Sequence, residues 1–94
     1  MVQKDGFPKA LDDVRVLDLG NFLGGPFCST LLAEFGADVI KVEQPGSGDF
    51  MRQAGGNEAS VNGVGLFWAQ ESRNKKSITC DLRKPRGQQL IKDL

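Results

Sequence analysis

Apolar and polar positions alternate in blocks along the chain, and the first blocks predict a strand, a helix and a second strand. Residues 14–19 place apolar side chains between acidic residues and a glycine, which is typical of a buried strand in a parallel sheet. Pro26 suits the first turn of a helix, and Gly36 suits its left-handed C-cap. Within that helix the residues that recur at helical spacing are Phe27, Thr30, Leu31 and Glu34.

A β-branched run at residues 38–43 predicts the second strand, so residues 14–43 form a βαβ unit with parallel strands and a right-handed crossover. Residues 44–76 are a long connection with turn residues at both 44–49 and 55–57, and a short helix fits within 64–71.

The last part of the chain, residues 77–94, reads as a strand at 77–82 and a helix that begins at Pro85. Leu90, Ile91 and Leu94 mark one apolar stripe on that helix, which has no stop signal. With residues 1–13 as a leader, the pattern predicts an α/β fold. We expect an incomplete Rossmann-like parallel sheet with flanking helices, the N-terminal part of a larger domain.

The composition is that of an ordinary globular chain. It has 94 residues, 39% of them hydrophobic, with a formal net charge of zero. No apolar run approaches the ~20 residues that a bilayer span needs, and the N-terminus lacks the apolar region of a secretory signal. We therefore expect no membrane partner and an intracellular location, cytoplasmic or, in a eukaryote, mitochondrial or peroxisomal.

Few side chains here are suited to catalysis or metal binding. The chain has no histidine, which excludes histidine-based triads and the commonest zinc ligand, so we expect no metal site. Cys28 falls in the first turn of a helix, where the dipole lowers a thiol pKa, but no histidine base is available. We interpret Cys28 and Cys80 as reduced thiols in the core, and Asp18 as a structural carboxylate that anchors a neighbouring loop.

Charge is distributed unevenly along the chain. Residues 73–86 carry six basic side chains against one acid, whereas residues 1–72 are net acidic. Such a basic stretch is either a solvated surface or a site for an anion. Its arginines and lysines suit the phosphates of coenzyme A. Nucleic acid also fits a basic patch, but too few aromatic residues are interleaved here for base stacking, so we expect no nucleic-acid partner.

The glycine-bearing turn at residues 20–25 precedes a helix N-terminus, which favours bound anions. Glu43 ends the second strand where a dinucleotide-binding fold places its ribose-binding acid. NAD binding is therefore an alternative. It is weakened because the glycine spacing is not G-x-G-x-x-G and because Pro26 removes a backbone donor. A tight turn within an α/β sheet explains the glycines equally well.

Four segments in order resemble family III coenzyme A transferases: residues 14–19, residues 25–33, residues 36–43 with 45–49, and residues 73–78 with Asp81 and Leu82. The resemblance implies a two-domain protein of which this chain is an N-terminal piece, with a homodimer of interlocked rings. It implies transfer of CoA between a CoA thioester and a small carboxylic acid, without a permanently bound cofactor. The family's catalytic aspartate, which forms covalent intermediates, has no match in this chain, so we expect the chain alone to be inactive.

The same resemblance implies CoA contacts after each strand. They fall at Leu23 and Gly24, at Gln44, and at the end of the third strand, and the basic cluster adds Lys75. The residues at the end of the third strand are Cys80, Asp81, Leu82 and Arg83. Gln44 stands where the family often has arginine, and Leu23 stands where formyl-CoA transferase-like members have glutamine, so oxalate or formyl specificity is not implied.

Two alternatives to CoA transfer stay open. One is epimerisation of an acyl-CoA, as in the racemase branch of the family. The other is a non-catalytic module that binds CoA or NAD. The coenzyme interpretation requires that the glycine turn and the basic flank of the third strand converge on one pocket.

Overall fold

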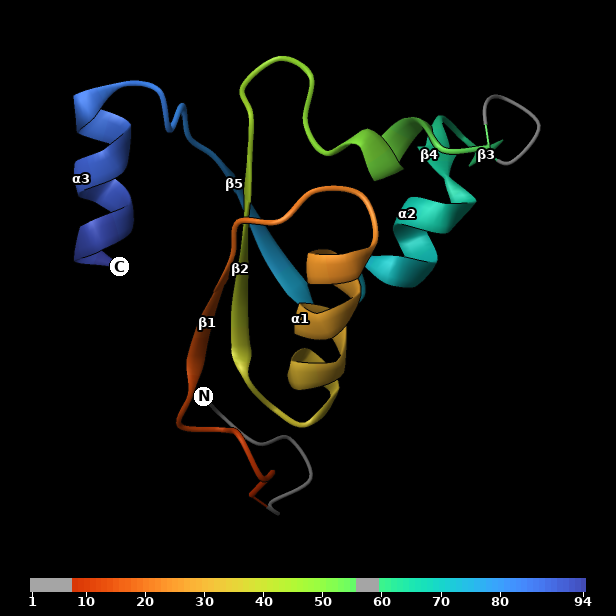
Figure 1. Ribbon diagram of the computed structural model, residues 1–94. Coiled ribbons are helices and arrows are strands. Elements are labelled where there is room, and N and C mark those ends of the chain that lie inside the picture. Colours follow the sequence, from red (N-terminus) through yellow and green to blue (C-terminus); the bar gives the residue numbers. More distant parts are fainter. Residues whose placement is uncertain (1–7, 56–59) are drawn as a thin grey trace.

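The computed structural model describes residues 8–55 and 60–94 and contains a parallel sheet of three strands in the order β1–β2–β5 (Figure 1). Helix α1 lies against one face of this sheet, and α3 lies on the other side (Figure 1). This arrangement confirms the predicted α/β fold with a parallel sheet and flanking helices. The bounds of these elements are β1 Arg15–Asp18, α1 Gly24–Glu34, β2 Asp38–Glu43, β5 Lys75–Thr79 and α3 Pro85–Asp93.

The apolar core lies between α1 and the sheet. Its buried residues are Ala33, Ala37 and Val39, and Leu11, Val16 and Leu32 pack against them. Gly36 has a φ of 104°, in the left-handed region, as the predicted C-cap requires.

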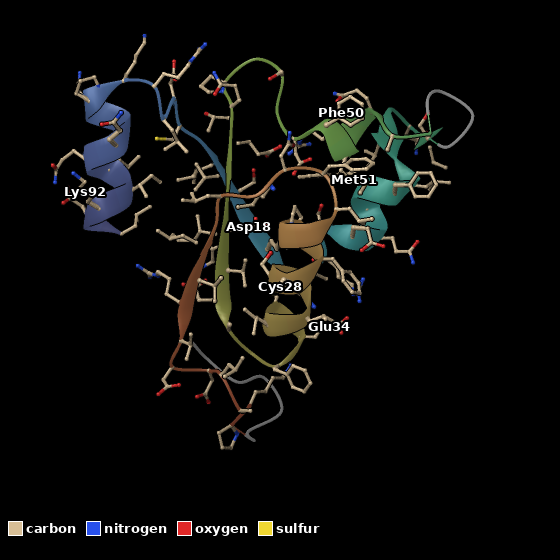
Figure 2. The ribbon with its side chains drawn as sticks, viewed as in Figure 1. Asp18, Cys28, Glu34, Phe50, Met51 and Lys92 are labelled. Atoms are coloured by element: carbon tan, nitrogen blue, oxygen red, sulfur yellow. The ribbon has the colours of Figure 1, made fainter. Side chains whose placement is uncertain are left out.

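The residues that recur at helical spacing in α1 do not form its buried face. The buried residues are Pro26, Ser29, Thr30 and Ala33, so of the recurring set Thr30 is buried whereas Phe27 and Leu31 are exposed. Cys28 is also exposed, so its assignment to the core was wrong (Figure 2). The physical reason is that the sheet presents charged groups to α1, and the small polar face of the helix supplies their hydrogen-bond partners.

The long connection between β2 and β5 contains regular structure. A 3₁₀-helix η1 (Phe50–Gln53) is followed by the antiparallel strands β3 (Ser60–Val61) and β4 (Val64–Gly65) and by helix α2 (Leu66–Glu71). Helix α2 confirms the predicted short helix. The hairpin was not predicted, and its turn at Asn62 and Gly63 has φ angles of 53° and 79°. Gly56 and Asn57 of the predicted turn and residues 1–7 of the predicted leader lie outside the described residues.

Strand β5 begins at Lys75, two residues before the predicted strand at 77–82. It ends at Thr79 because the backbone turns there. The Asp81 carboxylate accepts from the Arg83 backbone N–H at 3.0 Å, and the Lys84 N–H donates to the Asp81 carbonyl at 3.2 Å. This turn leads into α3, which begins at Pro85 as predicted. In the described ranges no helix is long and apolar enough to span a bilayer.

Candidate functional site

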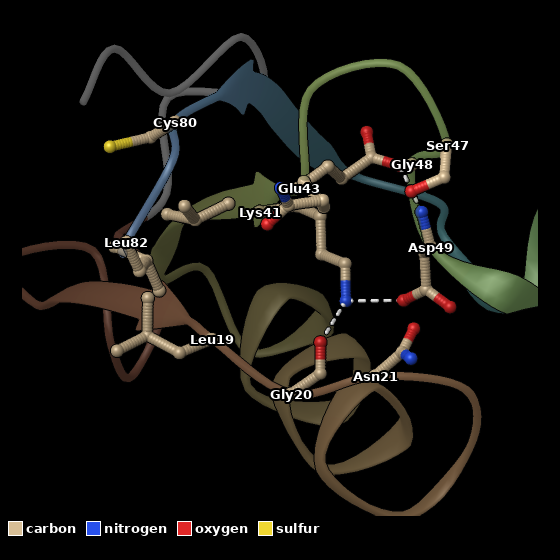
Figure 3. Close-up of a pocket in the computed structure, with 12 residues that line it drawn as sticks. Leu19, Gly20, Asn21, Lys41, Glu43, Ser47, Gly48, Asp49, Cys80 and Leu82 are labelled. Atoms are coloured by element: carbon tan, nitrogen blue, oxygen red, sulfur yellow. Dashed lines mark hydrogen bonds and ion pairs between the residues drawn. The ribbon is translucent and has the colours of Figure 1, made fainter. Parts of the chain in front are cut away.

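A pocket of about 340 Å³ opens where the carboxyl ends of the three parallel strands meet (Figure 3). Ligands of open α/β sheets bind at this edge, where the strands end and the loops diverge. Residues after β1, at the end of β2, in the loop after β2 and after β5 all contribute. The lining consists of Leu19, Gly20, Asn21, Lys41, Val42, Glu43, Gln44, Ser47, Gly48, Asp49, Cys80 and Leu82.

Lys41 extends from β2 beneath the pocket and is almost entirely buried (Figure 3). Its Nζ donates to the Gly20 carbonyl at 2.6 Å and forms an ion pair with the Asp49 Oδ2 at 2.5 Å. The Asp18 carboxylate lies 3.6 Å away on the other side. A buried ammonium is stable only when it is paired in this way, so Lys41 is committed to internal contacts.

Asp49 connects two walls of the pocket. Its Oδ1 accepts from the Phe22 N–H at 2.9 Å and from the Met51 N–H at 2.8 Å, which caps η1. The Asn21 side-chain carbonyl accepts in turn from the Phe50 N–H at 3.0 Å. The loop after β1 is therefore tied to the segment that begins η1.

Glu43 ends β2 with both carboxylate oxygens engaged. Arg52 donates to them at 2.6 and 2.7 Å, the Asp49 N–H donates at 2.9 Å, and the Ser77 hydroxyl also donates. The hydrogen-bonded Arg52 guanidinium, which also lies 3.9 Å from the Trp68 ring centroid, is the main cause that lowers the Glu43 pKa to about 2. No Glu43 oxygen is left over for ribose hydroxyls.

Asp18 holds the loop and α1 to the sheet, as the sequence predicted. Its carboxylate accepts from the Gly20 N–H at 3.0 Å, from the Ser29 hydroxyl at 2.7 Å and from Lys75 Nζ at 2.9 Å. Burial acts to raise the Asp18 pKa, but the hydrogen bonds from Lys75 and Ser29 and the charges of Lys41 and Lys75 together lower it.

The predicted CoA contacts fall into three groups. Gln44, Cys80 and Leu82 line the pocket together with Gly20. Asp81 and Arg83 lie next to these lining residues and form an ion pair with each other at 3.0 Å. Leu23 and Gly24 lie where α1 begins, outside the lining, and Leu23 is exposed.

The basic cluster is divided between the two ends of β5. Lys75 is 3% exposed and points inward to Asp18, so it has no surface to offer a ligand. Arg73 pairs with Glu34 and Lys76 pairs with Asp38, both at the edge of the sheet opposite the pocket. Only the basic residues after β5, which are Arg83, Lys84 and Arg86, lie at the pocket's end of the sheet.

Sequence reasoning missed the roles of Lys41 and Asp49. A lysine within an otherwise apolar strand was a usable signal, because a cation there needs a buried partner. The partner stands eight residues later in a glycine-rich turn, and that separation concealed the pair. Among the described residues no cluster of three cysteine or acidic side chains is arranged to hold a metal ion.

Comparisons with known proteins agree with the resemblance seen in the sequence. The model of CoA-transferase family III matches residues 11–94. Succinyl-CoA–D-citramalate CoA-transferase of Chloroflexus aurantiacus is 61% identical over 87 residues, which cover 93% of this chain and 21% of that protein. Formyl-CoA:oxalate CoA-transferase of Rhodopseudomonas palustris is 46% identical over 86 residues, which cover 92% and 20%.

A solved structure has the same fold. The crystal structure of a CAIB/BAIF family protein from Brucella suis superposes with a TM-score of 0.78 at 36% identity, covering 90% of this chain and 23% of that one. The chain thus spans about a fifth of the length of the curated relatives it matches, 21% of the first.

Proposed function

This chain belongs to CoA-transferase family III, and we propose that its pocket binds part of an acyl-CoA during transfer of CoA from a CoA thioester to a small carboxylic acid. The observation that carries the proposal is the meeting of Gln44, Cys80 and Leu82 with Gly20 in one pocket at the carboxyl edge of the sheet. Gln44, Cys80 and Leu82 are contacts that the resemblance implied, and Gly20 belongs to the glycine-bearing turn after β1.

The charges in and near the pocket support separate binding sites for the uncharged parts of CoA and for its phosphates. The one cation in the described lining, Lys41, is buried and paired, so the pocket itself suits the uncharged parts of the coenzyme. The phosphates would instead meet Arg83 and Lys84 on the connection between β5 and α3 and Arg86 in the first turn of α3, where the side chains are exposed.

Two observations favour CoA transfer over the alternatives. The compared relatives carry transferase names, which supports transfer rather than epimerisation. Both Glu43 oxygens are occupied by Arg52, Ser77 and the Asp49 N–H, which argues against the ribose contact that NAD binding would need. The acyl donor and the acceptor acid are not specified by these residues, and homodimerisation stays an expectation.

Calorimetric titration of the purified chain with CoA, dephospho-CoA and NAD tests the proposal. We expect CoA to bind more tightly than dephospho-CoA, and NAD to bind more weakly than either. Arg83→Ala should weaken CoA binding roughly tenfold, the loss of one charge-assisted hydrogen bond. Arg73→Ala removes the same charge at the opposite edge of the sheet and should leave CoA affinity unchanged. Tighter binding of NAD than of CoA would refute the assignment, as would equal affinities for Arg83→Ala and the parent.

A further inference from the structure

We propose that Lys41 and Asp49 are positioning residues for coenzyme binding, a buried clasp that fixes the loop after β1 against the segment beginning η1. The inference rests on the proposed function, since it concerns the geometry of the same pocket. The clasp is the pair of side chains together with the backbone groups they hold, which are the Gly20 carbonyl and the Phe22 and Met51 N–H groups. Neither side chain is among the contacts that the resemblance implied.

The clasp joins the two walls of the pocket. One wall is the loop at Gly20 and Asn21, and the other is the turn at Ser47 and Gly48. Lys41 holds the first wall through the Gly20 carbonyl, and Asp49 follows directly after the second. The 2.5 Å ion pair between Lys41 and Asp49 therefore sets how far apart the walls stand (Figure 3).

The loop adopts a conformation that needs an external hold. Phe22 has a φ of 66°, which costs a non-glycine residue on the order of 1 kcal/mol or more. The Phe22 N–H donates to Asp49, and the Phe22 ring meets the Phe50 ring edge-on with centroids 5.4 Å apart. Without the Asp49 carboxylate the Phe22 N–H would lose its partner, and the loop would keep only the ring contact, the Asn21 bond to the Phe50 N–H and the two bonds at Gly20.

Charge and hydrogen bonding can be separated by substitution. In Asp49→Asn the side-chain oxygen can still accept from the Phe22 N–H, but the charge that neutralises Lys41 is lost. In Asp49→Ala both interactions are lost. In Lys41→Met the Gly20 carbonyl loses its buried donor while the cap on η1 stays. The three variants thus remove, respectively, the charge of Asp49 alone, its charge and hydrogen bonds together, and the donor to the Gly20 carbonyl.

The matched control is Thr30→Val, which removes a buried hydroxyl that donates to the Pro26 carbonyl at 2.9 Å and also contacts the Glu71 carbonyl. It is nearly isosteric, lies on α1, and neither of these two carbonyls belongs to a wall of the pocket. A general loss of stability would appear in this control as well, whereas displacement of the loop would not.

Two measurements on the purified chain test the clasp. The first is amide hydrogen exchange of Phe22 by NMR, with the buried strand residue Val39 as internal reference. We expect exchange at Phe22 to accelerate about tenfold or more in Asp49→Ala relative to Val39, less in Asp49→Asn, and not at all in Thr30→Val. The second is calorimetric titration with CoA, for which we expect affinity to fall about tenfold in Asp49→Ala, to recover partly in Asp49→Asn, and to be unchanged in Thr30→Val.

The outcomes separate this inference from the proposed function. If the parent chain does not bind CoA, the proposed function fails, and amide exchange alone decides whether the clasp sets the loop. If exchange at Phe22 follows Val39 in every variant, the clasp is refuted. If exchange accelerates but CoA affinity is unchanged, Lys41 and Asp49 hold the loop without positioning the coenzyme, and the proposal is overturned. Should Asp49→Ala not fold, Asp49→Asn and Lys41→Met carry the same comparison.

Discussion

Charged side chains in the central strand are stabilised by partners that complete their hydrogen bonding. Lys41 and Glu43 are 2% and 4% exposed, a placement that would be costly for isolated charges. Lys41 donates to the Gly20 carbonyl and pairs with the Asp49 carboxylate. Glu43 accepts from the Arg52 guanidinium, the Ser77 hydroxyl and the Asp49 backbone N–H. Removing one partner of such a group leaves the other charge buried and uncompensated. Single substitutions there should therefore lower the free energy of unfolding by a measurable amount.

The lowered pKa of Glu43 predicts how the stability of the chain depends on pH. Its pKa is about 2 in the folded chain, against an ordinary value of 4.5. A depressed folded pKa stabilises the chain fully above pH 4.5, and that stabilisation is lost as the pH falls from about 4.5 to about 2. The free energy of unfolding should drop by up to about 3 kcal/mol across this window because of Glu43 alone.

Urea unfolding followed by circular dichroism between about pH 6 and pH 2 measures this contribution. Glu43→Gln should have a shallower pH dependence than the parent in that window, and so should Arg52→Met, which removes the main cause of the lowered pKa. Parallel curves for Glu43→Gln and the parent would show that the carboxylate does not contribute in this way.

Lys75 and Lys76 form a natural pair of test positions, since they are adjacent and carry the same charge. The Lys75 side chain is 3% exposed and donates to Asp18 and to the Pro26 carbonyl, whereas the Lys76 side chain is 73% exposed. Lys75→Met should therefore destabilise the chain by about 3 kcal/mol, and Lys76→Met by less than about 1 kcal/mol. Thermal and urea unfolding of the two variants provide the comparison. Equal destabilisation would contradict the inward orientation of Lys75.

At the scale of elements, the apolar pattern predicted most helices and strands because each is bounded by a turn residue or a capping residue. It did not identify the buried face of α1, because the spacing of apolar residues does not reveal that the sheet below the helix is charged. It also missed the β3–β4 hairpin, although Asn62-Gly63 between valines is a strong two-residue turn signal. The basic cluster is continuous in the sequence, but β5 runs through it and separates its two ends in space.

Gly87 allows α3 to begin close to the turn after β5. A Cβ built on Gly87 would lie 2.1 Å from the Asp81 carbonyl oxygen and 3.1 Å from the Cys80 Sγ. Gly87→Ala should therefore displace the first turn of α3, despite the roughly 1 kcal/mol by which alanine favours a helix interior. We expect a lower melting temperature and faster amide exchange in α3.

Gly24→Ala is the matched control for Gly87→Ala, since Gly24 also lies in a helix but a Cβ added there would have no atom within 4 Å. Its stability should be unchanged or raised by up to about 1 kcal/mol. If Gly87→Ala were as stable as Gly24→Ala, the close approach of α3 to Asp81 would be incorrect.

At the scale of the whole molecule, a large share of the bulky apolar side chains is uncovered. Leu19, Leu82 and Leu90 are 50%, 36% and 44% exposed, and Phe27 and Leu31 on α1 are exposed as well. Apolar surface of this extent is typical of a face that packs against another polypeptide. The chain spans only about a fifth of the length of its relatives, 21% of the first. The sequence predicted that the glycine turn and the basic flank of the third strand converge on one pocket. Gly20 of that turn lines the pocket, whereas none of the basic residues 73–86 is in its described lining. CoA contact at Gln44, Cys80 and Leu82 stays a proposal.

The carboxylates of the pocket are engaged in ion pairs, which bears on whether this chain can react with an acyl-CoA. Covalent CoA transfer needs a carboxylate free to attack a thioester. Glu43 and Asp49 are the two acids in the described lining, and both are buried and held by Arg52 and Lys41. We therefore expect the 94-residue chain to form no acyl or CoA adduct. Mass spectrometry of the chain after incubation with succinyl-CoA should detect only the unmodified mass, even where calorimetry detects CoA binding. An adduct mapped to Glu43 or Asp49 would contradict this, because those carboxylates would then be released from their ion pairs during the reaction.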